Sequence, residues 1–213
     1  MVNTLKKKRF NYGYVIIGLS FLALFVTMGI RGSFGTYLTA WEETFSVGRL
    51  SVSFVSFVSL LVYGSSMVAA GKLADRIGTR KVLSLSMLIL GVCLSASFFA
   101  TNIWHMVIIY GIFGSIGFGF GSNVTVSVAI VKWFKEKKGL AVSFVVLGMA
   151  AGPMIYSPIN LIVIDNIGWQ WLFLIYGSIY TFLFLPLFLI FFIDSPNDKK
   201  NKNNKKTSKT IPN

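Results

Sequence analysis

The sequence predicts an all-α integral membrane protein with six transmembrane helices. Three observations predict this fold class. Apolar residues make up 54% of the 213 residues and charged residues only 13%, whereas a soluble domain has about 25% charged residues. Six apolar runs are each long enough to cross a bilayer as a helix of about 20 residues. Finally, the Lys and Arg residues gather in short segments that border these runs.

Uninterrupted hydrophobicity identifies the six helices. Lipid offers no partners for backbone N–H and C=O groups, so a spanning segment must be a helix or part of a closed barrel. The runs lack the alternation of polar and apolar residues that barrel strands show. The predicted helices cover residues 13–37, 50–70, 82–101, 104–131, 139–163 and 170–193.

Several of the runs have distinguishing features. The first follows the basic segment Lys6–Arg9, as a secretory signal would, but its apolar part is too long for a cleaved signal and we expect it to be retained. The second and third runs flank Gly71–Lys81, and the sixth begins at Gly168-Trp-Gln-Trp171. The fourth is rich in glycine, at Gly111, Gly114, Gly117, Gly119 and Gly121. Aromatic residues near the ends are expected to form interfacial belts: Tyr12, Tyr14, Trp41, Trp104, Trp133, Trp169 and Trp171.

The basic residues set the predicted orientation. All but two of the 20 Lys and Arg residues lie in the N-terminal segment, the second-to-third connection, the fourth-to-fifth connection and the tail. The positive-inside rule places these segments, and both termini, in the cytoplasm. We therefore expect a multi-pass protein of the cell (plasma) membrane with membrane lipid as a partner. The net charge of +13 does not indicate nucleic acid, because the basic clusters border apolar spans.

Three parts of the chain are predicted. Residues 1–12 form a basic cytoplasmic N-terminus, and residues 13–193 form the six-helix bundle. Residues 194–213 form a Lys/Asn-rich cytoplasmic tail, which has too few apolar residues to bury a core and is expected to be disordered.

The segment Gly71-Lys-Leu-Ala-Asp-Arg-Ile-Gly-Thr-Arg-Lys81 carries the most specific pattern. Gly71 and Gly78 permit a tight turn and close helix approach. Asp75 can cap a helix N-terminus or pair with Arg. Arg76, Arg80 and Lys81 hold the loop in the cytoplasm. The segment resembles the loop motif G-x-L-a-D-R-x-G-x-R-K of the major facilitator superfamily, which implies a gating role for these six residues.

A second segment narrows the resemblance. Trp133-Phe-Lys-Glu-Lys-Lys-Gly-Leu-Ala141 is similar to the W/Y-F-x-x-[KR]-[KR]-x-x-A segment of monocarboxylate and oxalate/formate carriers. The resemblance implies a secondary active transporter that moves a small organic anion, such as a monocarboxylate, by alternating access. It also implies that the six helices form one half of a twelve-helix carrier, built as a 3+3 inverted repeat.

A short internal echo fits such a repeat. Asp75-Arg-Ile-Gly78 lies between the second and third runs, and Asp165-Asn-Ile-Gly168 lies between the fifth and sixth, on the other side. Inverted repeats would relate these two connections.

Arg31 and Asn123 are the candidate substrate-binding residues. Arg31 lies inside the first run, where an ionisable group is costly and usually faces a cavity or a partner. A guanidinium there could hold a carboxylate in a bidentate pair; alternatively, Arg31 extends to the outer interface. Asn123 is a candidate polar contact in the fourth helix. The first, fourth and fifth helices are expected to line the path.

Gly148, Gly152 and Pro153 in the fifth helix resemble an antiporter motif, but its closing Gly-Gly is replaced here by Tyr156-Ser157. Small residues that let helices approach are the other interpretation. The glycines of the fourth helix allow two interpretations as well, close packing or a loosened helix beside a central cavity.

Catalysis is not expected. One His, one Cys and no clustered carboxylates give no metal site and no catalytic residues, so we expect neither an enzyme nor a cofactor. Substrate contacts from a second half would be missing. A truncated remnant without transport, a pair with a separately encoded half, and a homodimer are the alternatives. As a remnant, the chain would act as a non-transporting membrane interaction partner.

Overall fold

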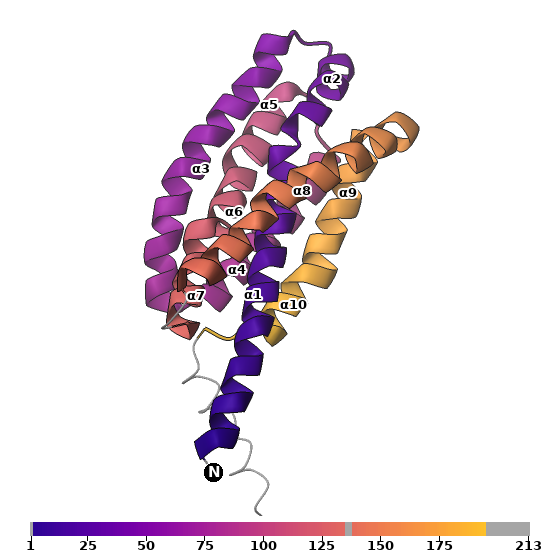
Figure 1. Ribbon diagram of the computed structural model, residues 1–213. Coiled ribbons are helices and arrows are strands. Elements are labelled where there is room, and N and C mark those ends of the chain that lie inside the picture. The colour runs from indigo at the N-terminus through magenta and orange to yellow at the C-terminus, as the bar shows by residue number, and fades with distance from the viewer. Residues whose placement is uncertain (1, 135–137, 195–213) are drawn as a thin grey trace, which may run out of the picture.

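Helices account for all regular structure in the part of the chain that the computed structural model describes (Figure 1). That part is the backbone of residues 2–134 and 138–194, with side chains from Tyr12 onward. The tail beyond Asp194, predicted to be disordered, and the basic residues Lys135 and Lys137 lie outside the described residues.

The elements are α1 Val2–Gly32, α2 Phe34–Phe45, α3 Arg49–Ile77, α4 Thr79–Ser97, α5 Ile103–Met106, the π-helix η1 Val107–Gly114, α6 Ser115–Phe120, α7 Asn123–Trp133, α8 Lys138–Ile167, α9 Trp169–Ile179, the π-helix η2 Tyr180–Phe184 and α10 Leu185–Phe191.

Six helical stretches are long and apolar enough to cross a membrane, which confirms the predicted fold class. The first, second, fourth and fifth stretches are longer than predicted, and the third and sixth are not. The first continues past residue 37, interrupted only at Ser33 between α1 and α2, and ends before Ser46, which takes the left-handed conformation with φ 50°. We call the six stretches spans one to six: Tyr12–Phe45, Arg49–Ile77, Thr79–Ser97, Ile103–Trp133, Lys138–Ile167 and Trp169–Phe191.

The spans pack in a pattern that exchanges the first three with the last three. Span one packs against span five, span two against span four, and span three against span six. Figure 1 shows α8 (orange) crossing α1 (indigo), with α3 on the other side of the bundle from α9 and α10. If spans one, two and three exchange places with spans four, five and six, the contact between spans one and five becomes the contact between spans four and two. The contact between spans three and six is unchanged by this exchange. The packing is that of a 3+3 inverted repeat.

The two connections that echo each other in sequence share one backbone conformation. Gly78, the residue between α3 and α4, has φ 95° and ψ 146°, and Gly168, between α8 and α9, has φ 86° and ψ 159°. Each glycine N–H bonds the carbonyl four residues earlier, in Ala74 at 3.2 Å and in Ile164 at 3.0 Å. These dihedral angles are open almost only to glycine. The echo is therefore a structural repeat of two one-residue turns at opposite ends of the bundle.

Glycines bring spans one and five into backbone contact. A Cβ atom on Gly148 would lie 2.6 Å from the carbonyl oxygen of Phe21, and one on Gly152 would lie 2.8 Å from the nitrogen of Gly29. Small residues drive association in lipid because they let backbones approach closely. This packing role is the second of the two interpretations of Gly148 and Gly152.

Aromatic side chains fill the outer end of the core. Tyr37, Trp41, Tyr110, Trp169 and Phe173 are all buried and pack ring against ring. The predicted interfacial position of Trp41 and Trp169 was therefore wrong, because the first span continues to Phe45 and carries Trp41 into the core. Trp104 and Trp171 are 61% and 51% exposed at the outer ends of their spans, as expected of a belt.

Replacing the turn glycines should destabilise the bundle. We expect Gly78→Ala and Gly168→Ala each to cost about 1–3 kcal/mol, because an L-residue is strained at these angles. The midpoint of thermal unfolding in detergent measures the effect. Gly64→Ala is the matched control, since Gly64 lies within α3 and a Cβ there would meet nothing within 4 Å. Equal midpoints for all three variants would contradict this account.

Separating α1 from α8 should also be costly. Gly148→Ala should destabilise the protein by about 1–3 kcal/mol, because the added methyl group overlaps the backbone of Phe21. Gly139→Ala in the same helix is the control, because a Cβ at Gly139 would meet no other atom within 4 Å. A Gly148 variant as stable as the Gly139 variant would show that the contact is looser than described.

Candidate functional site

Arg31 lies at the level of the helix centres. It occupies the last turn of α1, near the middle of the 34-residue span Tyr12–Phe45. Its guanidinium carbon is 3.9 Å from the ring centroid of Tyr63, the central residue of the 29-residue helix α3. The adjacent Gly32 touches Pro153, which is near the middle of α8. The guanidinium thus stacks on a mid-depth residue instead of extending toward the outer ends of the helices.

The charge of Arg31 has no counter-charge in the described part of the chain. Its Nε atom is buried and has no hydrogen-bond partner there, and no described carboxylate forms an ion pair with it. Glu42, the next carboxylate along the same span, lies about 16 Å further along the helix axis. Stacking on an aromatic ring offsets part of the cost of burying a cation. An anion that reached Arg31 would offset more of it.

Tyr110 is a second aromatic residue near Arg31. It is 1% exposed, its hydroxyl has no hydrogen-bond partner among the described residues, and the charge of Arg31 acts on it electrostatically. Its ring packs against Phe34 and Trp41, with ring centroids 6.1 and 5.6 Å apart. Tyr110 lies in the π-helix η1, an irregularity of the kind that the loosened-helix interpretation of span four describes. Sequence reasoning did not predict a role for Tyr110 or for Tyr63.

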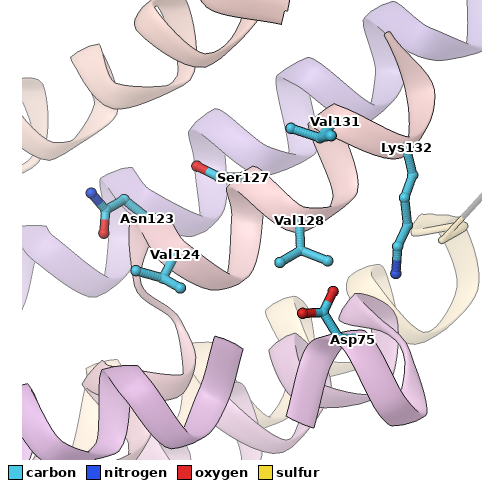
Figure 2. Close-up of a pocket in the computed structure, with 7 residues that line it drawn as sticks. All are labelled: Asp75, Asn123, Val124, Ser127, Val128, Val131 and Lys132. Carbon is cyan, nitrogen blue, oxygen red and sulfur yellow. The ribbon is translucent and has the colours of Figure 1, made fainter. Parts of the chain in front are cut away.

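Asn123 lies elsewhere, in an open groove of about 470 Å³ (Figure 2). It begins α7 after a second irregularity of span four at Gly121 and Ser122, where the Thr27 hydroxyl donates to the Gly121 carbonyl at 3.2 Å. The next residue, Val124, packs against Gly71, which is about 12 Å along α3 from Tyr63. The structure therefore separates the two predicted substrate-binding residues. The groove is lined by Asp75, Asn123, Val124, Ser127, Val128, Val131 and Lys132.

The motif Gly71–Lys81 borders this groove. Asp75 is exposed at the end of α3, and Figure 2 shows its carboxylate and the Lys132 ammonium on opposing walls. Gly71 allows the close approach of α7, since a Cβ there would lie 2.8 Å from Val124 Cγ1. Arg76 and Lys81 are exposed. The turn and close-approach roles predicted for the two glycines are confirmed.

Asp194, and not Asp75, caps the helix that follows the motif. The backbone N–H of Arg80 donates to Asp194 Oδ1 at 2.6 Å, and the Arg80 guanidinium donates to the carbonyl of Leu189. The carboxylate thereby satisfies an N–H in the first turn of α4 and opposes the positive end of its dipole. The partners are 114 residues apart, so no local sequence signal could have identified the cap.

Two more side chains hold the same end of span six. The Tyr12 hydroxyl donates to the Phe191 carbonyl at 2.7 Å, and Trp133 Nε1 donates to the Ile193 carbonyl at 2.9 Å. The last carbonyls of a helix lack intrahelical partners. Donors from spans one, three and four therefore satisfy backbone carbonyls at the C-terminal end of span six.

Asn160 joins three helices at the outer side of Arg31. It is fully buried, donates from Nδ2 to the Tyr37 hydroxyl at 2.8 Å and accepts from the Tyr176 hydroxyl at 2.6 Å. These bonds link α2, α8 and α9. Sequence reasoning missed Asn160, although an amide inside an otherwise apolar run is itself a signal of a buried polar contact.

Pro153 lies inside α8 together with Pro158, and the helix continues through both. Pro153 packs against Gly32, next to Arg31. Span five therefore contacts span one next to Arg31. The aromatic residues near the guanidinium, Tyr63 and Tyr110, come instead from spans two and four. For metals, the described residues contain no group of three or more His, Cys, Asp or Glu side chains placed to hold an ion.

Comparisons with known proteins agree with this architecture. Residues 20–212 match the family model of the Major Facilitator Superfamily. An uncharacterized MFS-type transporter, YcxA of Bacillus subtilis, is 30% identical over 78% of this chain and 40% of its own length. Monocarboxylate transporter 9 of Gallus gallus is 27% identical over 79% of this chain and 33% of its own length. The chain thus spans well under half the length of these relatives.

A solved structure shows the same fold. The crystal structure of a bacterial homolog of the human lysosomal transporter Spinster, in an inward-facing and unoccupied conformation, superposes with a TM-score of 0.72 at 15% identity. The match covers 87% of this chain and 44% of the solved chain. The family match, six spans packed as an inverted repeat and the loop motif Gly71–Lys81 together show that the chain belongs to the major facilitator superfamily of membrane transporters.

Proposed function

We propose that the chain is a secondary active transporter of a small organic anion such as a monocarboxylate, or the N-terminal half of such a transporter, and that it works by alternating access. The observation that carries the proposal is the guanidinium of Arg31, which lies at mid-depth without a described counter-charge. A transported anion supplies that counter-charge each time it binds. The name of the chicken relative, a monocarboxylate transporter, supports the same substrate class.

Recognition at this site would rest on charge and shape. A guanidinium presents parallel N–H donors that match the two oxygens of a carboxylate, and charge-assisted bonds of this kind are the strong ones. The Tyr63 ring covers one face of the guanidinium, so the substrate would approach along its edge. The aromatic side chains of spans two and four would contact the apolar part of a small acid.

The cytoplasmic groove has a separate role in this proposal. Asp75 is exposed on the wall of the groove and has no described ion-pair partner. We assign Gly71, Asp75, Arg76, Gly78, Arg80 and Lys81 to a gate, in which Asp75 contacts a second six-helix half when the cytoplasmic side is closed. Asn123 in the same groove is a polar contact on the cytoplasmic part of the path. The second half is a covalent continuation, a separately encoded chain or a second copy.

We also propose an orientation in the membrane. The basic connections between spans two and three and between spans four and five support a cytoplasmic location of those ends and of both termini, in a cell whose plasma membrane holds the protein.

Removing the guanidinium should strongly reduce saturable uptake. We expect Arg31→Ala to reduce kcat/KM for radiolabelled pyruvate by roughly 30-fold or more, because a buried charged contact is worth about 2–5 kcal/mol. Arg31→Lys keeps the charge but loses the two-pronged geometry, so its activity should be intermediate. The measurement is uptake into proteoliposomes that contain the chain with its second half.

Arg49→Ala provides the control, because Arg49 is exposed at the start of span two and touches no part of the Arg31 region. Wild-type uptake in the Arg31→Ala variant would refute the site. No uptake by any form, together with a stable partner recovered by cross-linking, would favour a non-transporting interaction protein.

Neutralising Asp75 should affect turnover and not binding. We expect Asp75→Asn to lower kcat about tenfold with KM unchanged, because the gate contact forms only in one conformation of the carrier and contributes roughly 1.4 kcal/mol to it. Lys72→Gln, at an exposed neighbouring residue outside the groove, should leave both constants unchanged. A rise in KM alone would place Asp75 in substrate binding instead.

A further inference from the structure

Tyr63 stacks on the Arg31 guanidinium, and nothing in the sequence motifs accounts for this contact. The guanidinium carbon lies 3.9 Å from the centroid of the Tyr63 ring. The two residues come from different spans, and Tyr63 packs against the main hydrophobic core while it remains half-buried. The ring therefore contacts both the core and the guanidinium.

This contact constrains both the position and the direction of the charge. An arginine side chain has many rotamers, and holding it in one of them costs entropy unless a partner fixes it. A ring at 3.9 Å from the guanidinium carbon favours a stacked arrangement, which leaves the N–H groups around the edge for a ligand. The contact also lowers the cost of keeping a cation among apolar helices.

The neighbouring aromatic residue cannot perform the same function. Tyr110 is locked among Phe34, Trp41 and Phe118, with ring centroids 6.1, 5.6 and 5.7 Å away. The ring contact recorded for Arg31 in the described residues is with Tyr63 and not with Tyr110. Among the described residues, the orientation of the guanidinium thus depends on Tyr63.

We propose that Tyr63 is a positioning residue of the anion site, whose ring face holds the Arg31 guanidinium stacked with its N–H edge free to accept a carboxylate from the membrane-embedded path. This inference rests on the proposed function, since it presupposes that an anion binds at Arg31. It assigns the effect to the aromatic ring and not to the hydroxyl. It also makes span two, which was not expected to line the path, a part of the site.

Binding measurements on ring variants test the proposal. The probe is pyruvate, titrated in nanodiscs against the chain together with its second half, as in the uptake measurement. We expect Tyr63→Leu to raise Kd roughly tenfold, as loss of a partly desolvated cation–π contact predicts, and Tyr63→Phe to stay within about twofold of wild type because the ring is kept. Leu61→Ala, at an exposed position on the same helix, is the control. A Tyr63→Phe variant as impaired as Tyr63→Leu would overturn the proposal, because the hydroxyl would then be the active group.

A second readout does not depend on any ligand. Phenylglyoxal modifies accessible guanidinium groups, and peptide mass spectrometry reports its rate at Arg31 separately from that at Arg49. We expect Tyr63→Leu to accelerate labelling of Arg31 several-fold, Tyr63→Phe to leave it unchanged, and Arg49 labelling to be the same in all variants. Unchanged labelling of Arg31 in Tyr63→Leu would overturn the proposal.

The two readouts separate this inference from the proposed function. Faster labelling of Arg31 in Tyr63→Leu, combined with no pyruvate binding by any form, would mean that Tyr63 positions Arg31 but that the site does not take this class of anion. That outcome would overturn the assignment of Tyr63 to an anion site and would count against the proposed function as well. Unchanged labelling with normal pyruvate binding would leave the function standing and remove only the role of Tyr63.

Discussion

Close backbone approach between helices is the constraint on which the rest of the structure depends. In lipid, apolar side chains gain nothing from leaving one apolar surface for another, so helices associate through packing and hydrogen bonds. Gly148 and Gly152 supply the contact between α8 and α1, and Gly91 and Gly177 supply the contact between α4 and α9, where a Cβ on Gly91 would lie 3.2 Å from the Gly177 carbonyl oxygen. These contacts fix the height of each span against its neighbour. That alignment places Arg31 of span one beside Tyr63 of span two and Tyr110 of span four.

The buried polar groups at two levels of the bundle differ in whether they have partners. On the outer side of Arg31, Asn160 satisfies its own hydrogen-bonding groups with the hydroxyls of Tyr37 and Tyr176, so this network is complete within the protein. At Arg31 the opposite holds, because the described residues leave a buried Nε and the Tyr110 hydroxyl without partners. A buried polar group without a partner costs free energy, and such sites persist where a function requires them. This contrast is one of the observations that support the proposal of a binding site at Arg31.

Much of the fold could be predicted from the sequence because it follows from hydropathy and local motifs. Six apolar runs gave six spans, and the pattern around Gly78 predicted a turn that only glycine can adopt. The orientation of Arg31 could not be predicted, since it depends on Tyr63 in another span. The same limit applies to Asp194, which caps α4 from 114 residues away, and to Trp41, whose burial depends on how far the first helix continues. Arg31 and Asn123 were both candidates for substrate binding because each is a polar residue in an apolar run, but only the register of α7 on α3 shows that they lie at different depths.

The glycine turns at Gly78 and Gly168 have a mechanical consequence. Each joins two long helices without an intervening loop, so the helices on either side share a single pivot of two dihedral angles. A helix pair joined in this way can change its angle but cannot slide, since sliding would need slack in the chain. The bundle therefore contains two hinged helix pairs, α3 with α4 and α8 with α9, whose glycine hinges lie at opposite ends of the bundle. A change of angle within one pair separates the two helices at the end away from the hinge and leaves the hinged ends together. Each end of the bundle thus has one pair that is held by its glycine and one pair whose helices are not joined there.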